Sequence, residues 1–227
     1  MTSTTKRVKR NGESIKRRLA KLHDILDKNR KTLFKKQHRG PTKFKFVGSF
    51  AVGTGSINPG NKAHFNNGKS GFIRHNFKEN TFVFVKPVPE QDRLSEEKKL
   101  LYRKAKRILR KFDPEFAKGE FHVQFAYMKP GRGRVDRHKD NDISYQYAIS
   151  LGTYRGACLR SYSEDEKSFT DLDNHNKIAK FDGRLSHEVI TDNFSGKRFT
   201  VIFYKNYDRR KTEADPILHK PRLYSLD

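Results

Sequence analysis

The first apolar pattern along the chain lies in a strongly basic segment near its start. Its apolar positions recur at spacings of four, three and four: Ile15, Leu19, Leu22 and Leu26. This spacing places them on one face of a helix, so we expect a basic amphipathic helix over roughly residues 13–37. Gly40-Pro41 ends it. The apolar stripe should dock on the folded body or on a partner.

A second helical pattern begins at Ser95, whose side chain can cap the first turn. Glu96 and Glu97 follow, where negative charge suits the helix dipole. One face is apolar: Leu101, Ala105, Ile108 and Phe112. Asp113-Pro114 terminates the pattern. We interpret this segment as a support helix on the back of a sheet.

The remaining apolar segments are short and separated by Gly, Pro, Asn and Asp, which is typical of strands. Eight such runs are visible: 42–52, 81–85, 121–128, 145–151, 156–162, 177–182, 187–190 and 198–205. Eight short strands fit a jelly-roll barrel of two facing sheets. We therefore predict a mainly β fold with flanking helices (α+β), a double-stranded β-helix preceded by a basic N-terminal helix.

Charge adds information about partners. The chain has 227 residues with 50 Lys and Arg against 26 Asp and Glu, a formal net charge of +24. So large an excess favours polyanions, with nucleic acid first and an anionic membrane surface or acidic protein as alternatives. The cluster Lys16, Arg17, Arg18 and Lys21 can be a phosphate-contacting arm or a solvated helix face, and the sequence leaves both open.

Several site and location classes are disfavoured. A single cysteine, Cys158, excludes an intrachain disulfide framework and a multi-cysteine zinc site. The sequence has no secretory apolar segment and no apolar run of about 18 residues, so we expect an intracellular protein without a membrane partner. The run Lys6-Arg7-Val8-Lys9-Arg10 resembles a nuclear import signal. A monomer is the default expectation.

One stretch carries metal-binding chemistry. His138 and Asp140 lie two residues apart, and on a strand such positions face the same side. A third ligand must come from a distant segment, and His187 is the candidate. Two His and one carboxylate on one face of a metal is the arrangement of non-haem Fe(II) oxygenases. The alternative is a chance surface turn in a charged chain.

A longer ordered set of residues carries a family resemblance: Tyr127, Gly131, His138-x-Asp140, His187 and Arg198-Phe-Thr200. This set looks like the double-stranded β-helix of the Fe(II)/2-oxoglutarate-dependent dioxygenases and covers roughly residues 120–207. The resemblance implies an oxidoreductase that uses Fe(II), 2-oxoglutarate and O₂.

The resemblance also implies residue roles. His138, Asp140 and His187 would be the metal ligands and catalytic residues, leaving positions for 2-oxoglutarate and O₂. Arg198, eleven residues beyond the distal His, would hold the far carboxylate of 2-oxoglutarate in a bidentate pair. Thr200 would add a hydrogen bond from the same face, and we place Tyr127 with this cosubstrate site.

Within this superfamily the runs 144–159, 181–187 and 194–204 are similar to the TET/JBP group. That group oxidises the methyl of 5-methylcytosine or thymine in nucleic acid, which implies a nucleic-acid partner, with DNA ahead of RNA. A base must leave the duplex to be modified, so a stacking partner is needed. We assign Asn141, Tyr145 and Tyr147 to substrate binding. Ordinary barrel packing is the alternative for each tyrosine.

Two other functions stay open. One is a prolyl or other protein hydroxylase of the same superfamily, which does not need so high a charge. The other is a non-catalytic nucleic-acid-binding barrel without metal. For any of these functions we expect three regions: a helical extension at 1–40, a double-stranded β-helix domain at 41–207 with its core at 120–207, and a tail at 208–227.

Overall fold

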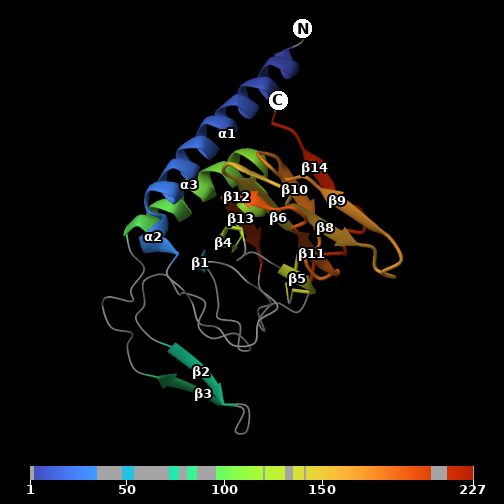
Figure 1. Ribbon diagram of the computed structural model, residues 1–227. Helices are drawn as coiled ribbons and strands as arrows, with labels where there is room; N and C mark the ends of the chain where they lie inside the picture. Colours follow the sequence, from blue (N-terminus) through green and yellow to red (C-terminus); the bar gives the residue numbers. More distant parts are fainter. Residues whose placement is uncertain are drawn as a thin grey trace.

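The computed structural model describes most of the chain (Figure 1). The described ranges are residues 3–34, 48–53, 72–76, 81–85, 96–119, 121–130, 135–140, 142–205 and 214–226. Asn141 and Gly131, which the sequence analysis singled out, lie outside them, as do residues 208–213 of the expected tail.

The described helices lie within the first 118 residues. They are α1 (Ser3–Lys28), α2 (Arg30–Leu33), α3 (Glu96–Phe112) and the short 3-10 helix η2 (Phe116–Lys118). The prediction of a helix starting at the Glu96-Glu97 pair and ending before Asp113 is confirmed. The N-terminal helix begins earlier than expected and is interrupted at Asn29, whose side-chain amide donates to the Ile25 carbonyl at 3.0 Å.

The strands among the described residues number more than the eight expected. They are β1 (Gly48–Gly53), β2 (Phe72–Asn76), β3 (Thr81–Val85), β4 (His122–Met128), β5 (Val135–His138), β6 (Gln146–Leu151), β7 (Tyr154–Arg155), β8 (Cys158–Tyr162), β9 (Phe169–Leu172), β10 (Ile178–Phe181), β11 (His187–Ile190), β12 (Ser195–Gly196), β13 (Arg198–Tyr204) and β14 (Arg222–Tyr224).

Two sheets form the body. One has six strands in the order β1-β4-β13-β6-β10-β14, and the other has four in the order β5-β11-β8-β9. Eight strands make the barrel: β4, β5, β6, β8, β9, β10, β11 and β13. If these barrel strands are numbered one to eight along the chain, one sheet has the order 1-8-3-6 (β4-β13-β6-β10). The other sheet has the order 2-7-4-5 (β5-β11-β8-β9). This is the double-stranded β-helix that the sequence predicted.

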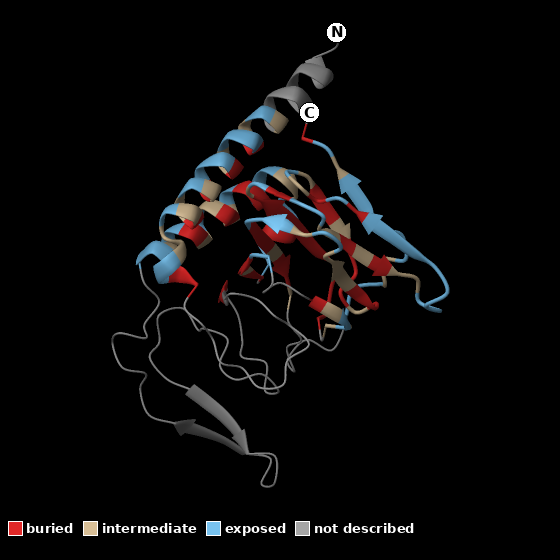
Figure 2. Cartoon of the chain, in the orientation of Figure 1, coloured by how far each residue is buried: buried red, intermediate tan, exposed pale blue. Residues whose placement is uncertain are grey.

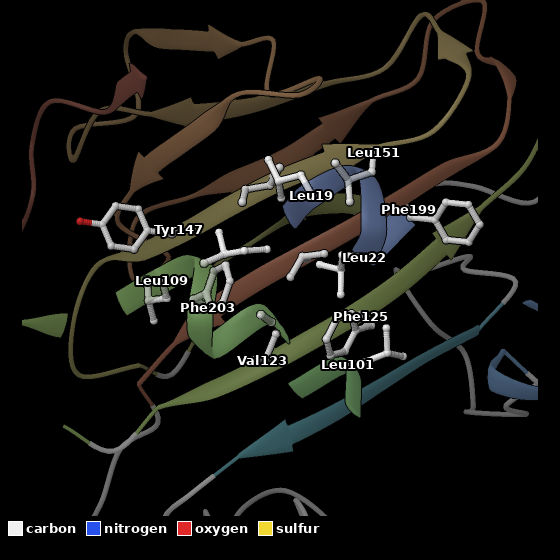
Figure 3. Close-up of a cluster of buried hydrophobic side chains, with 14 of the residues drawn as sticks. Leu19, Leu22, Leu101, Leu109, Val123, Phe125, Tyr147, Leu151, Phe199 and Phe203 are labelled. Atoms are coloured by element: carbon white, nitrogen blue, oxygen red, sulfur yellow. The ribbon is translucent and has the colours of Figure 1, made fainter. Parts of the chain in front are cut away.

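The outer face of the six-stranded sheet packs on the helices. Alternate residues of each strand point to this side, among them Phe125 of β4, Tyr147 of β6 and Phe199 of β13. Leu22 of α1 and Leu101 of α3 are fully buried against them (Figure 3). The apolar stripe of α1 therefore docks on the body of the same chain, one of the two outcomes expected (Figure 2).

The inner face of the six-stranded sheet meets the four-stranded sheet. A smaller cluster lies between them: Ala148, Leu159, Leu172, Ala179 and Phe181, with Ile202 packed against it. Because Ile202 shares its face of β13 with Arg198 and Thr200, these two polar side chains also face the interior between the sheets.

The strand that carries the first candidate histidine ligand was not among the eight apolar runs counted from the sequence. β5 has the sequence Val-Asp-Arg-His, in which only one residue is apolar. It ends at His138, so Asp140 lies beyond the strand. The expectation that both ligands sit on one strand is corrected here. Among the described helices, none combines the length and apolar composition needed to cross a bilayer.

Candidate metal centre

The two candidate histidine ligands lie on neighbouring strands. β11 runs antiparallel to β5, and this register sets His187 directly opposite His138. The ring centroids are 4.2 Å apart, so both imidazoles reach the same point. Their exposures differ, since the His187 side chain is 7% exposed and that of His138 is 15%. The partner strand thus supplies the distal ligand that the sequence could only propose.

Asp140 completes the group from the loop after β5. Its Oδ1 lies 3.5 Å from Nε2 of His138, and its Oδ2 lies 3.5 Å from Nε2 of His187. One ligand atom from each residue lies within 4.8 Å of the others. The backbone N–H of Asp140 donates to the Gly183 carbonyl at 2.7 Å, which fixes this loop position without a strand. These three residues can hold a metal ion.

Backbone contacts set the tautomers of both rings. The Nδ1 of His138 lies 2.8 Å from the carbonyl oxygen of Asp136, and the Nδ1 of His187 lies 3.0 Å from that of Leu185. A carbonyl oxygen can only accept, so each Nδ1 carries the hydrogen in the neutral ring. Each Nε2 then keeps its lone pair on the Asp140 side, which is the arrangement a metal-binding imidazole requires.

The protonation states also suit a divalent cation. Burial alone would raise the pKa of Asp140, but its contacts with His138 and His187 outweigh burial, and the pKa is lowered. Burial lowers the pKa of His187, more than the nearby Asp140 raises it. At neutral pH the group therefore offers one carboxylate and a neutral distal imidazole.

Gln146 orients the carboxylate. Its Nε2 donates to Asp140 Oδ2 at 2.7 Å and also to Oδ2 of buried Asp142. Burial, followed by repulsion from Asp140, raises the pKa of Asp142 to about 8, so Asp142 is protonated at neutral pH. Gly183 lies directly against this pair, and a Cβ there would overlap the Gln146 amide. The residues that surround the Asp140 carboxylate are therefore closely packed.

A second polar group lies on the inner face of β13. Arg198 is 1% exposed, and its guanidinium approaches Sδ of Met128 at 3.4 Å and Oδ1 of Asn174 at 3.5 Å. Its Nε has no hydrogen-bond partner. Burial lowers the pKa of Arg198, opposed only by Tyr154 and Cys158, so no carboxylate of the described residues neutralises it. A buried guanidinium without a counter-charge carries a desolvation cost, so the site favours binding of an anion.

Further buried polar atoms around Arg198 lack partners. They are Oγ1 of Thr200 and Nδ2 of Asn174. The Tyr154 ring lies 5.7 Å from the guanidinium carbon, close enough for each to shift the pKa of the other. Buried donors are almost always satisfied in folded proteins. A carboxylate of a bound molecule, with two acceptor oxygens, would satisfy several of these groups at once.

The three tyrosines assigned to the site lie elsewhere. Tyr127 faces the helices, where its ring stacks on Phe199 at 4.9 Å, so it is on the sheet face opposite Arg198. The hydroxyl of Tyr147 donates to Asp113 at 2.6 Å, and that of Tyr145 to the same oxygen at 3.3 Å. The assignment of these tyrosines to cosubstrate and base is corrected: they pack the helical side of the barrel.

The contributions of Gln146, Asn174 and Tyr154 were missed from the sequence. Only Gln146 had a usable signal, because it lies between two aromatic residues of a strand and must face the other side. Asn174 lies in the turn before β10, and its position depends on the backbone bond that its carbonyl accepts from the Ser150 N–H. The substrate role given to Asn141 falls outside the described residues.

Comparisons with known proteins give no family for this chain. No protein-family model matches the sequence, and no curated protein matches it. Among solved structures, a variant of oxalate decarboxylase from Bacillus subtilis is similar at 15% identity with a TM-score of 0.30, covering 42% of this chain and 24% of that one. The vicilin of hazelnut, Corylus avellana, is similar at 10% identity with a TM-score of 0.32, covering 46% and 26%.

These likenesses are partial. The matched part spans about a quarter of the length of both proteins, 24% and 26%. TM-scores near 0.3 establish neither a family nor an activity, so the assignment of the barrel depends on its own strand order.

Proposed function

We propose that this chain is an Fe(II)/2-oxoglutarate-dependent dioxygenase that hydroxylates the methyl group of a base in nucleic acid. The observation that carries the proposal is the unneutralised guanidinium of Arg198, buried on the inner barrel face beside unpaired Thr200. A His-Asp-His group alone can hold several metals. A buried cation in the same barrel interior adds a site for a dicarboxylate, which 2-oxoglutarate is.

The residues present fit this cofactor and cosubstrate. His138, Asp140 and His187 would hold the iron on one face, through two lone-pair nitrogens and an ionised carboxylate. When bound, Fe(II) with 2-oxoglutarate and O₂ supplies hydroxylation of a C–H bond, with release of succinate and CO₂. Arg198 and Thr200 would bind the distal carboxylate, and their burial excludes water from that contact.

Nucleic acid as substrate is supported by charge. The formal net charge is +24, and α3 carries a stripe of cations at helical spacing: Arg103, Arg107, Arg110 and Lys111. All four are exposed, and the last three form no ion pair with a described carboxylate. Arg17 and Lys21 add exposed cations on α1, which packs beside α3. These helices lie outside the six-stranded sheet, so they would hold the polymer rather than select the base.

A protein side chain is the second candidate substrate. Tyr145 and Tyr147, expected to stack on an extruded base, are occupied by packing against Phe116. The ring of Phe181 lies against His187, but it is buried in the inner cluster and offers no open face to an extruded base. A protein hydroxylase of the same superfamily needs no stacking partner.

The first experiment measures chemistry. The protein is incubated with Fe(II), 2-oxoglutarate and ascorbate in air, and succinate is quantified with and without methylated duplex DNA. We expect iron-dependent succinate formation, lost in His138→Ala and kept in His219→Ala, whose exposed ring pairs with Glu164. Equal succinate formation in both variants would reject the proposed iron site. If the wild type forms none, the chain is better explained as a non-catalytic binding module.

The second experiment identifies the substrate. Mass spectrometry of nucleosides after incubation with DNA containing 5-methylcytosine should show the hydroxymethyl product. Succinate formation that is stimulated by a protein extract but not by methylated DNA or RNA would instead favour the protein hydroxylase.

The third experiment tests the basic helix face. Changing Arg107, Arg110 and Lys111 together to Ser should weaken DNA binding. The slope of log affinity against log salt should decrease by about 0.9 for each phosphate that the variant no longer neutralises.

A matched variant changes Lys129, Arg155 and Lys167, which are exposed and lie outside α3 and the elements packed against it. It has the same net charge and should keep the original slope. Equal losses in the two triple variants would indicate only a general charge effect. Preferential binding to vesicles of anionic lipid over DNA would point to a membrane surface as the partner.

A further inference from the structure

The turn between β8 and β9 has an unusual backbone. The N–H of Glu166 donates to the carbonyl of Ser163 at 3.0 Å, and the N–H of Ser163 donates to the carbonyl of Ser168 at 2.9 Å. Glu166 has φ +60°, in the left-handed region. A non-glycine residue there is disfavoured by roughly 1–2 kcal/mol, and such residues persist where the surrounding structure requires them.

The side chain of Glu166 reaches both strands that carry the histidine ligands. Its Oε1 accepts from the hydroxyl of Ser186 at 2.6 Å and lies 3.2 Å from Nζ of Lys139. Its Oε2 accepts from Nη2 of Arg137 at 2.6 Å. One carboxylate therefore joins the β5 strand and its following loop to the residue immediately before β11.

These partners are the immediate neighbours of the ligands. Arg137 and Lys139 flank His138 in the sequence, and Ser186 precedes His187. Because adjacent residues of a strand point to opposite sides, the contacts of Glu166 lie outside the barrel while the imidazoles point inward. We propose that Glu166 is a positioning residue of the metal centre, which holds the two histidines at their mutual distance and neutralises the cations beside them. This inference rests on the proposed metal centre.

The charge argument adds to the geometric one. A divalent cation bound at the triad would lie near the positive charges of Arg137 and Lys139, and both oppose its binding. The Glu166 carboxylate pairs with each of them. The hydrogen bond from Ser186, followed by that from Lys139, lowers the pKa of Glu166, so the charge persists at neutral pH. Removing it would leave two uncompensated cations beside the metal.

Removing a residue that orients a metal ligand typically weakens metal binding by about 10- to 100-fold. We therefore expect Glu166→Gln to weaken Mn(II) binding at least tenfold, measured by isothermal titration calorimetry without cosubstrate. The matched control is Glu164→Gln in the same turn, since Glu164 pairs with His219 and contacts neither ligand strand in the described structure.

Glu166→Gly separates positioning from folding. Glycine adopts φ +60° without strain, so the metal-free variant should melt at the wild-type temperature or above it. Its Mn(II) affinity should nevertheless fall as in Glu166→Gln. If the effect is partly electrostatic, adding Lys139→Met to Glu166→Gln should recover part of the lost affinity.

The outcomes separate this inference from the proposed function. If the wild type binds no Mn(II), the metal centre itself is rejected, and the role of Glu166 with it. If the wild type binds Mn(II) and both Glu166 variants bind it equally well, the metal centre stands and the positioning role is overturned. A loss of Mn(II) affinity that follows a loss of melting temperature in both Glu166 variants would also overturn it, because the residue would then act on folding alone.

Discussion

Replacing Arg198 by Met should raise stability and strongly weaken cosubstrate binding. The guanidinium is 1% exposed and no described carboxylate neutralises it, so the folded protein carries a desolvated cation. Replacing buried ionic groups by apolar side chains of similar size is often stabilising by about 1–4 kcal/mol. Methionine fits the site because the guanidinium already contacts Sδ of Met128.

The effect on binding should have the opposite sign. Removing one member of a buried charge pair costs about 2–5 kcal/mol, and each 1.4 kcal/mol is tenfold in affinity. We therefore expect the affinity for 2-oxoglutarate to fall by about 30- to 3,000-fold. For a chain of this size, each kcal/mol of added stability should raise the melting temperature by about 2–4 °C.

Two assays on the same protein measure these effects. Urea denaturation without ligand gives the free energy of unfolding. Thermal melting with Mn(II) and increasing 2-oxoglutarate gives ligand stabilisation, which should be present in the wild type and much smaller in Arg198→Met. Arg155→Met, at an exposed position of β7, is the control and should change neither.

A loss of more than about 1 kcal/mol of stability in ligand-free Arg198→Met would refute the reasoning, because it would show that the guanidinium is satisfied within the protein. Unchanged stabilisation by 2-oxoglutarate would refute the assignment of its carboxylate to this site.

Three further variants test other parts of the structure. Gly183→Ala should weaken Mn(II) binding about tenfold in titration calorimetry. The added methyl would overlap the Gln146 amide, which orients the carboxylate of Asp140. Unchanged affinity would contradict this packing. Leu22→Ala should lower the free energy of unfolding by about 2–5 kcal/mol in urea, since the side chain is fully buried, and a loss below about 1 kcal/mol would mean that α1 is not docked in solution. Asp182→Asn should destabilise the fold above pH 4. Burial would raise the pKa of Asp182, but hydrogen bonds from Arg184 and the Leu218 N–H outweigh it and lower the pKa in the folded state. The ionised carboxylate therefore stabilises the fold above its unfolded pKa, and this stabilisation is lost as the pH falls through the folded pKa. Denaturation at pH 7 and pH 3 checks this, and an equal loss at both values would exclude the ionised pair as the cause.

Strong periodicity made the helices and most core strands predictable. The spacing of Leu19 and Leu22 identified a helix, and the apolar alternation of β13 identified a strand. β5 and β9 could not be identified this way because their charged residues face solvent and few apolar ones remain. Their pairing partners, β11 and β8, supply the hydrogen bonds that make them strands.

That the three candidate ligands come together was predictable from residue type and order, while the supporting residues were not. His138, Asp140 and His187 are brought together, but the tyrosines were assigned to the wrong face. The same alternation that places Gln146 inside places its tyrosine neighbours outside, so this error was avoidable. Asn174 is different, because its place beside Arg198 follows from a turn geometry that no local pattern encodes.

The strand order has a consequence for how the protein forms. β13, the last of the eight barrel strands in the chain, lies between β4 and β6 in the middle of the six-stranded sheet. Until synthesis passes Tyr204, β4 and β6 have no shared neighbour and keep open edges, with the aromatic face of β4 incompletely covered. Pairings so distant in sequence form slowly. The barrel is therefore expected to close late, and nascent or truncated chains lacking β13 should be the aggregation-prone species.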